Sequence, residues 1–396
     1  MNLYIIVFIV ILIVLYNIQS NIFNEITYSN TYTIGITNNI NIVKFTNTFL
    51  KIVNKKMVNK NIIVKVYENN TDLLTDINSN KIEYGICNET EVIESHLGLN
   101  SYSDNKLNSI RFITGLFYNY QYFLTDIFYK DSSKSSEITS INDLKDFYQT
   151  YNRHFIIGTE DKYSDSFKCL MILLNVYDFI PVDIETLDKT KKYDKNTIFY
   201  QTYDIDNLIT KFNSNLIDGL FIINIYNYGK LRTILDKKNV IFLDLSYEKT
   251  IFNDLFSNYY YNKNITIANF SEDIDSTYTF NTKVNRIILI TNDRTEDSIV
   301  EKLIKTYYTN NNYLINNLLS TNEATDTTEH TTFEPIDMIY INKFIKIHDS
   351  AYKYMESLGF IIDEGIKGQI DLNNNDKYNH YWKYDKIGIN SFTLGD

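Results

Sequence analysis

The chain has 396 residues, of which 44% are hydrophobic and 22% are charged, so it is long enough for two or three folded domains and too apolar for an intrinsically disordered protein. Its formal net charge of -11, without a basic block, disfavours a nucleic-acid partner, because phosphate binding needs clustered Lys and Arg. Cys87, Cys169 and five scattered histidines show no zinc, HExxH or disulfide spacing. We therefore expect no cofactor, no metal and no catalytic residue.

The chain opens with an apolar run, LYIIVFIVILIVLY, at residues 3–16. This run is close to the roughly 7–15 residues of a signal-peptide core and shorter than the roughly 20 that span a bilayer. Ser20 is a candidate cleavage site, but the start of the chain has no basic residue. Residues 1–20 are predicted to be a signal peptide or an uncleaved membrane anchor, so the body of the chain is expected to be secreted or extracytoplasmic.

Strand and helix patterns then alternate in two sets. The first set begins with a strand at 32–37 and continues with a helix whose apolar face carries Val43, Phe49, Leu50 and Val53. A strand at 61–69, a helix at 72–80 and a strand at 82–88 complete this set. In the second set, strands at 153–159, 197–202 and 217–224 enclose helices at 164–175 and 204–215. A β-α-β-α-β order with short connections is typical of an open, mostly parallel sheet.

Two such sets predict an α/β fold with two lobes, each a mixed, mostly parallel sheet flanked by helices. Two strands are expected to cross between the lobes, near residues 120–126 and 279–291, and each lobe is expected to have its own sheet. The predicted division assigns the chain as follows: residues 21–125 to the first part of lobe one, 126–280 to lobe two, 281–362 to the return into lobe one, and 363–396 to a C-terminal extension.

Ligands of open α/β sheets bind beyond the carboxyl ends of the strands. That rule nominates Thr37, Asn38, Asn88 and Glu89 in the first lobe and Thr159, Ser164, Ser166 and Asn224 in the second. The ring of Tyr226 follows the last of these strands and is placed to cover a solute. The alternative interpretation is that these residues are ordinary helix caps and strand ends.

Near the C-terminus, the segment IKIHDSAYKYMESLGF predicts a short helix. Asp349 or Ser350 is expected to cap its start, and Gly359 to end it in a left-handed conformation. His348 has no part in that prediction.

The ordered series of segments resembles the TAXI-type solute receptors of TRAP transporters, which have the type II periplasmic-binding-protein clamshell fold. The similar segments, spread over residues 30–362, are YTIGITNN, IEYGICNETEV, ITSINDLKDF, FIIGTEDKYSDS, IDGLFIINIYNYGKL and IKIHDSAYKYMESLGF. The resemblance implies a receptor that closes on a small polar solute, an amino acid or organic acid, and works with membrane transporter subunits. It adds Asn119 to the ligand-binding residues and identifies His348 as the family's His, with a role that is structural or near the cleft and not catalytic.

The chain departs from the family pattern at its glycines. Thr37, Asn38 and Asn39 stand where the family has a glycine-rich turn, and Asn88 replaces the usual Gln. Since glycine lets a backbone approach a ligand closely, these changes put the family's ligand in question. A retained scaffold that serves as a surface interaction protein is the main alternative function, and an enzyme of a related fold is a further one. Because only Lys162 and Lys168 flank the second-lobe loop, while Glu89 and Asp165 add negative charge, we expect a zwitterionic or neutral polar solute to be preferred over a dicarboxylate, or no solute to bind tightly.

Overall fold

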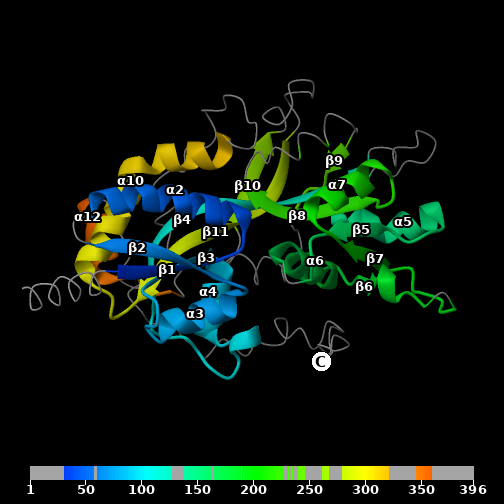
Figure 1. Ribbon diagram of the computed structural model, residues 1–396. Helices are drawn as coiled ribbons and strands as arrows, with labels where there is room; N and C mark the ends of the chain where they lie inside the picture. The colour runs from blue at the N-terminus through cyan, green and yellow to red at the C-terminus, as the bar shows by residue number, and fades with distance from the viewer. Residues whose placement is uncertain are drawn as a thin grey trace, which may run out of the picture.

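The computed structural model describes residues 31–57, 60–126, 138–162, 164–188, 190–225, 231, 234, 240–245, 261–266, 279–320 and 345–358. The predicted leader, Tyr226 and the C-terminal extension lie outside these residues. The described chain forms two α/β units joined through two long strands (Figure 1). We call the described parts of 31–97 and 297–358 unit one, and those of 138–225 unit two.

Unit one confirms the first predicted β-α-β-α-β set. Strand β1 (Thr31–Thr37) lies between β2 (Asn61–Tyr67) and β3 (Tyr84–Asn88) and is parallel to both. The helices α2 (Ile40–Lys56), α3 (Asn70–Asn78) and α4 (Glu89–Leu97) follow these strands in turn. The amphipathic pattern that predicts α2 holds because Phe49, Leu50 and Val53 are buried against the sheet.

Unit two confirms the second set. Its strands run in the order β8 (Gly219–Ile225), β5 (Ile156–Thr159), β7 (Thr197–Thr202) and β6 (Ile180–Asp183), and all the pairs are parallel. The helices are α5 (Leu144–Tyr151), α6 (Asp165–Val176) and α7 (Ile205–Asn213). Strand β6 was not predicted, because its four residues include Pro181 and are too few to show a period.

The two predicted crossing segments belong to β4 (Ile110–Asp126) and β11 (Thr279–Asn292), which pair antiparallel. Strand β11 also pairs with β3 of unit one, and β4 with β8 of unit two. Short strands β9 (Val240–Phe242) and β10 (Tyr261–Thr266) add to β4 and β11.

The hydrogen bonding is therefore continuous, in the order β2-β1-β3-β11-β4-β8-β5-β7-β6. The expectation that each lobe has a separate sheet is wrong. The reason is that β4 and β11 pair with each other along most of their length, so the backbone groups of the crossing strands are satisfied without a break between the units. The predicted α/β class, with two mostly parallel strand sets flanked by helices, is confirmed.

Two further α-helices of the described chain belong to unit one. Helix α10 (Asp297–Ser320) packs on α2 and on α12 (Asp349–Ser357), and was not predicted. Single 3₁₀ turns lie at Asn100–Tyr102, Ile141–Asp143 and Ile184–Thr186. None of the helices within the described ranges combines the length and the apolar character needed to cross a bilayer.

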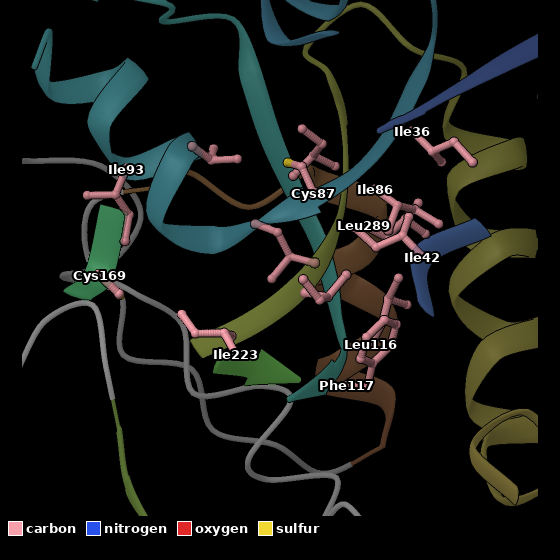
Figure 2. Packing of buried hydrophobic residues seen from close by; sticks show 14 of the residues in the cluster. Ile36, Ile42, Ile86, Cys87, Ile93, Leu116, Phe117, Cys169, Ile223 and Leu289 are labelled. Atoms are coloured by element: carbon pink, nitrogen blue, oxygen red, sulfur yellow. The ribbon is translucent and has the colours of Figure 1, made fainter. Parts of the chain in front are cut away.

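One hydrophobic cluster runs from unit one into unit two. Figure 2 shows Cys87 and Ile93, from β3 and α4, in the same cluster as Cys169 of α6 and Ile223 of β8. Every residue of α4 is buried, and the helix ends at Gly98, whose φ of 71° is the left-handed conformation that suits glycine. The two units are thus packed against each other through apolar side chains and not only tethered by strands.

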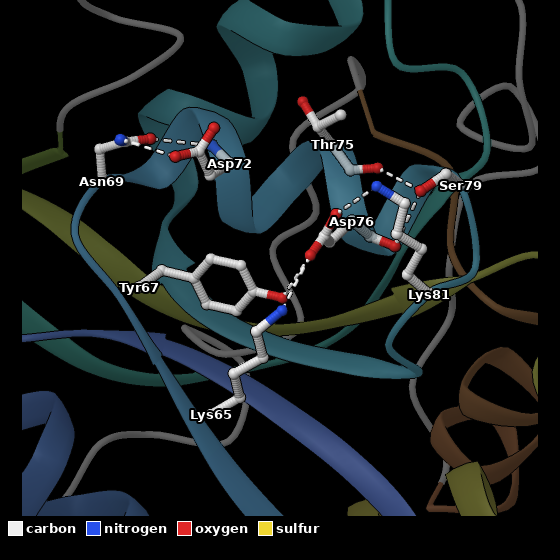
Figure 3. A network of polar contacts seen from close by, with 8 residues as sticks. All are labelled: Lys65, Tyr67, Asn69, Asp72, Thr75, Asp76, Ser79 and Lys81. Carbon is white, nitrogen blue, oxygen red and sulfur yellow. Dashed lines mark hydrogen bonds and ion pairs between the residues drawn. The ribbon is translucent and has the colours of Figure 1, made fainter.

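On the outer surface of unit one, a carboxylate ties α3 to β2. Asp76 accepts a hydrogen bond from the Tyr67 hydroxyl at 2.8 Å and forms ion pairs with Lys65 and Lys81, each at 3.0 Å (Figure 3). Burial raises the pKa of Asp76, but the hydrogen bonds from Lys81, Tyr67 and Lys65 outweigh it and lower the pKa to about 2. The carboxylate therefore stays charged and holds the helix in place.

The start of α12 differs from the prediction. His348, and neither Asp349 nor Ser350, is the N-cap, since its Nδ1 accepts a hydrogen bond from the backbone N–H of Ser350 at 3.3 Å. Its extended backbone, with φ −68° and ψ 136°, allows this geometry because a cap residue lies outside the helix. His348 thus has a structural role at this helix start, one of the two roles that the family resemblance implies. Gly359 lies outside the described residues.

Candidate functional site

Polar side chains of the two units meet where β3 ends and α6 begins. Asn88, the last residue of β3, donates a hydrogen bond from Nδ2 to the carboxylate of Asp165, the first residue of α6. On the other side, Asn285 of β11 donates from Nδ2 to Asn88 Oδ1 at 3.2 Å. A line of hydrogen bonds therefore runs from a crossing strand through unit one to unit two.

A second contact between the units is an ion pair. Lys168 Nζ of α6 lies 2.8 Å from Glu91 Oε1 of α4; the lysine side chain is 41% exposed and that of the glutamate 10%. Burial lowers the pKa of Lys168, but the charges of Glu91 and Asp165 raise it by more, so the net pKa is above its ordinary value. The ammonium of Lys168 is therefore already engaged by carboxylates.

Asn119 and Asn285 lie opposite each other on β4 and β11, so their side chains share one face of the sheet. Each residue is 3% exposed, and the Oδ1 atom of each has no hydrogen-bond donor among the described residues. We call the set of Asn88, Glu91, Asn119, Asp165, Lys168 and Asn285 the junction cluster.

A third contact joins α2 to β8. Asn41 Nδ2 donates to Asn224 Oδ1 at 2.9 Å, and the same oxygen accepts from the backbone N–H of Ile225 at 2.9 Å. Asn224 is buried and bonded to Asn41 of unit one, so this predicted residue does lie where the units meet. Its amide oxygen is occupied by protein donors in this arrangement.

The predicted serines of unit two serve the local structure. Ser164 is the N-cap of α6, and its Oγ accepts from the backbone N–H of Phe167 at 3.0 Å. Ser166 Oγ donates to the Glu160 carboxylate and accepts from the backbone N–H of Ile223 at 2.8 Å. The hydroxyl of Ser166 therefore fixes α6 against β8.

Thr37 and Asn38 lie at the carboxyl end of β1, where Thr37 is partly exposed and Asn38 is exposed. Thr159 ends β5 and is fully buried, and no donor among the described residues reaches its Oγ1. In the described part of the chain, no hydrogen bond or ion pair between the units involves Thr37 or Asn38. The predicted residues thus divide into those at the junction, such as Asn88, and those that only border it.

The expectation that Glu89 adds charge to the rim of the site is wrong. Its carboxylate is fully buried and forms a bidentate ion pair with the guanidinium of Arg286, also fully buried, on β11. Arg286 lies beside Asn285, so alternation along the strand sends the two side chains to opposite faces of the sheet. Glu89 therefore anchors α4 to the sheet and is not available to a solute.

A separate cavity of about 310 Å³ lies at the other end of β4 and β11, against the start of α12. It is lined by Arg111, Asp293, Asp297, Lys346, Ile347, His348, Asp349 and Tyr352. None of the predicted ligand-binding residues contributes to it. Within the described ranges, no group of three or more His, Cys, Asp and Glu side chains is placed to hold a metal ion.

The prediction did not include Asn41, Glu91 or Asn285. Asn285 lies within the predicted crossing segment at 279–291, and Glu91 within the segment NETEV that follows β3. Neither pattern marks one residue over its neighbours, because facing the junction depends on the register of β11 and on the packing of α4.

No family model and no curated protein matches the chain. Solved structures do, among them XAC2383 from Xanthomonas citri bound to a chloride ion, which is 7% identical over 87% of this chain and 99% of its own, with a TM-score of 0.44. PstS from Borrelia burgdorferi is 12% identical over 74% and 97%, with a TM-score of 0.40. The periplasmic aliphatic sulphonate binding protein SsuA from Escherichia coli is 11% identical over 75% and 80%, with a TM-score of 0.36.

Proposed function

We propose that the chain is an extracytoplasmic solute-binding protein that holds a small polar solute between units one and two. The observation that carries this proposal is the meeting of polar side chains from both units, Asn88 with Asp165, at the carboxyl end of β3 and the start of α6. In open α/β folds this is the position at which ligands bind. Residues 1–20 would deliver the protein across a membrane or anchor it there.

Opening and closing would use β4 and β11 as the hinge, because β11 pairs with unit one, β4 pairs with unit two and the two strands pair with each other. The contacts Asn88–Asp165, Lys168–Glu91 and Asn41–Asn224 join the units directly and would break on opening. A solute that entered would offer its own polar groups in place of these contacts.

The finer proposal is a receptor of the TRAP type that works with membrane transporter subunits and prefers a zwitterionic or neutral solute over a dicarboxylate. Arg286 is buried with Glu89, and Lys168 is paired with Glu91, so each of these two cations is engaged by a carboxylate. The N-termini of α4 and α6 add about 0.3–1 kcal/mol each to anion binding, against roughly 8 kcal/mol for micromolar affinity.

A retained scaffold without a solute is the second candidate, and one observation favours it. The units already contact each other through hydrogen bonds, and one hydrophobic cluster includes residues of both. Such an arrangement would be stable as a fixed surface for a partner protein.

The experiment that separates the two is mass spectrometry of small molecules released when purified full-length protein is denatured. A defined polar solute supports the receptor, and an empty protein supports the scaffold.

We expect Asn88→Ala to weaken binding of the released solute by about tenfold, since the variant removes one hydrogen-bonding side chain from the junction. Isothermal titration of stripped protein measures this change. Asn207→Ala, an exposed position at the start of α7, is the matched control and should bind as the natural chain does. Equal affinity of the Asn88 variant and the natural chain would refute the proposed site.

A further inference from the structure

The junction cluster carries more negative than positive charge. Asp165 and Glu91 are the carboxylates around Lys168, and Glu160 lies close enough to Asp165 for the two charges to interact. Burial raises the pKa of Asp165, and the charge of Glu91 adds to that effect, while Lys168 and Asn88 oppose it. Within the junction cluster, two carboxylates thus stand against the one ammonium of Lys168, and a positively charged group would balance the second.

The uncharged members of the cluster also present acceptors. Asn119 Oδ1 and Asn285 Oδ1 are buried on adjacent strands and have no donor among the described residues. The amide of Asn285 is directed toward the cluster, because its Nδ2 reaches Asn88 Oδ1 at 3.2 Å. Buried acceptors are almost always paired in folded proteins, so two unpaired acceptors on opposite residues of one sheet face point to a group that donates to both.

We propose that the junction cluster recognises the protonated amine of a cationic solute, an inference that rests on the proposed solute-binding role and replaces the zwitterionic or neutral solute of the finer proposal. The ammonium would donate hydrogen bonds to Asn119 Oδ1 and Asn285 Oδ1 and pair with the carboxylate of Asp165. A primary ammonium carries three donors and no acceptor, which matches this set. A carboxylate carries acceptors only and would face Asp165 with a like charge.

Without a solute, the Nδ2 group of Asn88 donates to the Asp165 carboxylate. On binding, the solute ammonium would replace this neutral donor with a charged one, and charge-assisted hydrogen bonds are the stronger kind. The favoured solutes are thus primary amines with a net positive charge, such as diamines and basic amino acids.

The test is isothermal titration of stripped full-length protein at low ionic strength with three probes of four carbons each: 1,4-diaminobutane, 4-aminobutyrate and succinate. We expect 1,4-diaminobutane to bind at least about tenfold more tightly than 4-aminobutyrate, and succinate to give no heat. Asp165→Asn should weaken diamine binding by at least about tenfold. Glu296→Gln, which changes a carboxylate paired with Lys60 on the surface, is the control and should leave it unchanged.

Asn119→Leu tests the unpaired acceptor. We expect it to weaken diamine binding while the Tm stays the same or rises, because the variant removes a buried acceptor that the folded protein leaves unpaired. A purely structural asparagine would instead lower the Tm and leave binding by the folded fraction unchanged.

The outcomes separate this inference from the proposed function. Diamine binding that neither Asp165→Asn nor Asn119→Leu weakens would overturn the inference, as would tighter binding of succinate than of the diamine. If none of the probes binds, the solute released on denaturation decides: a primary amine with a net positive charge supports the inference, and any other solute overturns it while the proposed function stands. An empty protein that binds no probe would overturn both.

Discussion

Replacing Arg286 with Met is expected to lower the free energy of unfolding by about 3–5 kcal/mol, because it leaves the buried carboxylate of Glu89 without its counter-ion. Both side chains are fully buried, and the guanidinium also lies 5.7 Å from the centre of the Phe112 ring. Urea unfolding of the variant and the natural chain, followed by circular dichroism, measures the loss.

The double variant Glu89→Leu with Arg286→Met removes both charges and is expected to recover most of that stability, since a buried ion pair is often replaced by apolar residues at little cost. Glu296→Gln is the matched control. The side chain of Glu296 is 47% exposed and that of its partner Lys60 is 27% exposed, so this ion pair should contribute about 0–1 kcal/mol to the free energy of unfolding. A loss below about 1 kcal/mol in the Arg286 variant would mean that water or another cation reaches Glu89.

Acidification is expected to destabilise the protein through His96 of α4. Burial lowers the pKa of His96 from 6.5 to about 4, and the charges of Arg111 and Lys346 add to the effect. The unfolded chain therefore takes up the proton first, so the contribution of His96 is fully present above pH 6.5 and is lost as the pH falls toward about 4. Between these two pH values the free energy of unfolding falls by about 3 kcal/mol, since each unit of pKa difference corresponds to 1.36 kcal/mol.

Urea unfolding at pH 7 and at pH 4.5 tests this expectation. His96→Gln should show a smaller loss of stability between the two pH values than the natural chain does. His348 is also expected to reduce stability on acidification, since burial lowers its pKa too. The variant His348→Asn measures the contribution of His348, because Asn can cap α12 without titrating. Parallel losses in the natural chain and the His96 variant would contradict the assignment to His96.

Local patterns predicted the repeating elements because each carries its own period. The buried strand β3 was found within a few residues of its ends, and the four apolar residues of the first predicted helix all lie within α2. The same logic failed for α4, whose residues are all buried, so that its polar residues gave no surface stripe to read. It also failed at the cap of α12, because His is not among the residues that usually occupy an N-cap.

For the candidate site, the strand-end rule placed Asn88 and Asn224 at the meeting of the units but wrongly placed Glu89 on the rim. The difference lies in partners far along the chain. Glu89 meets Arg286, and Asn88 meets Asn285, each across 197 residues. Whether a polar residue next to a strand end is exposed or locked in the core depends on such a partner.

By itself, the sequence determined the α/β class, the two β-α-β-α-β sets and the excess of negative charge, because hydrophobic period and composition are properties of short segments. Only the tertiary structure decided that β4 and β11 form one continuous sheet with both units, that Glu89 belongs to the core and that Asn119 faces Asn285. The physical reason is strand register. A shift of β11 by one residue would exchange the faces of Asn285 and Arg286, and no local pattern specifies which of the two meets the junction.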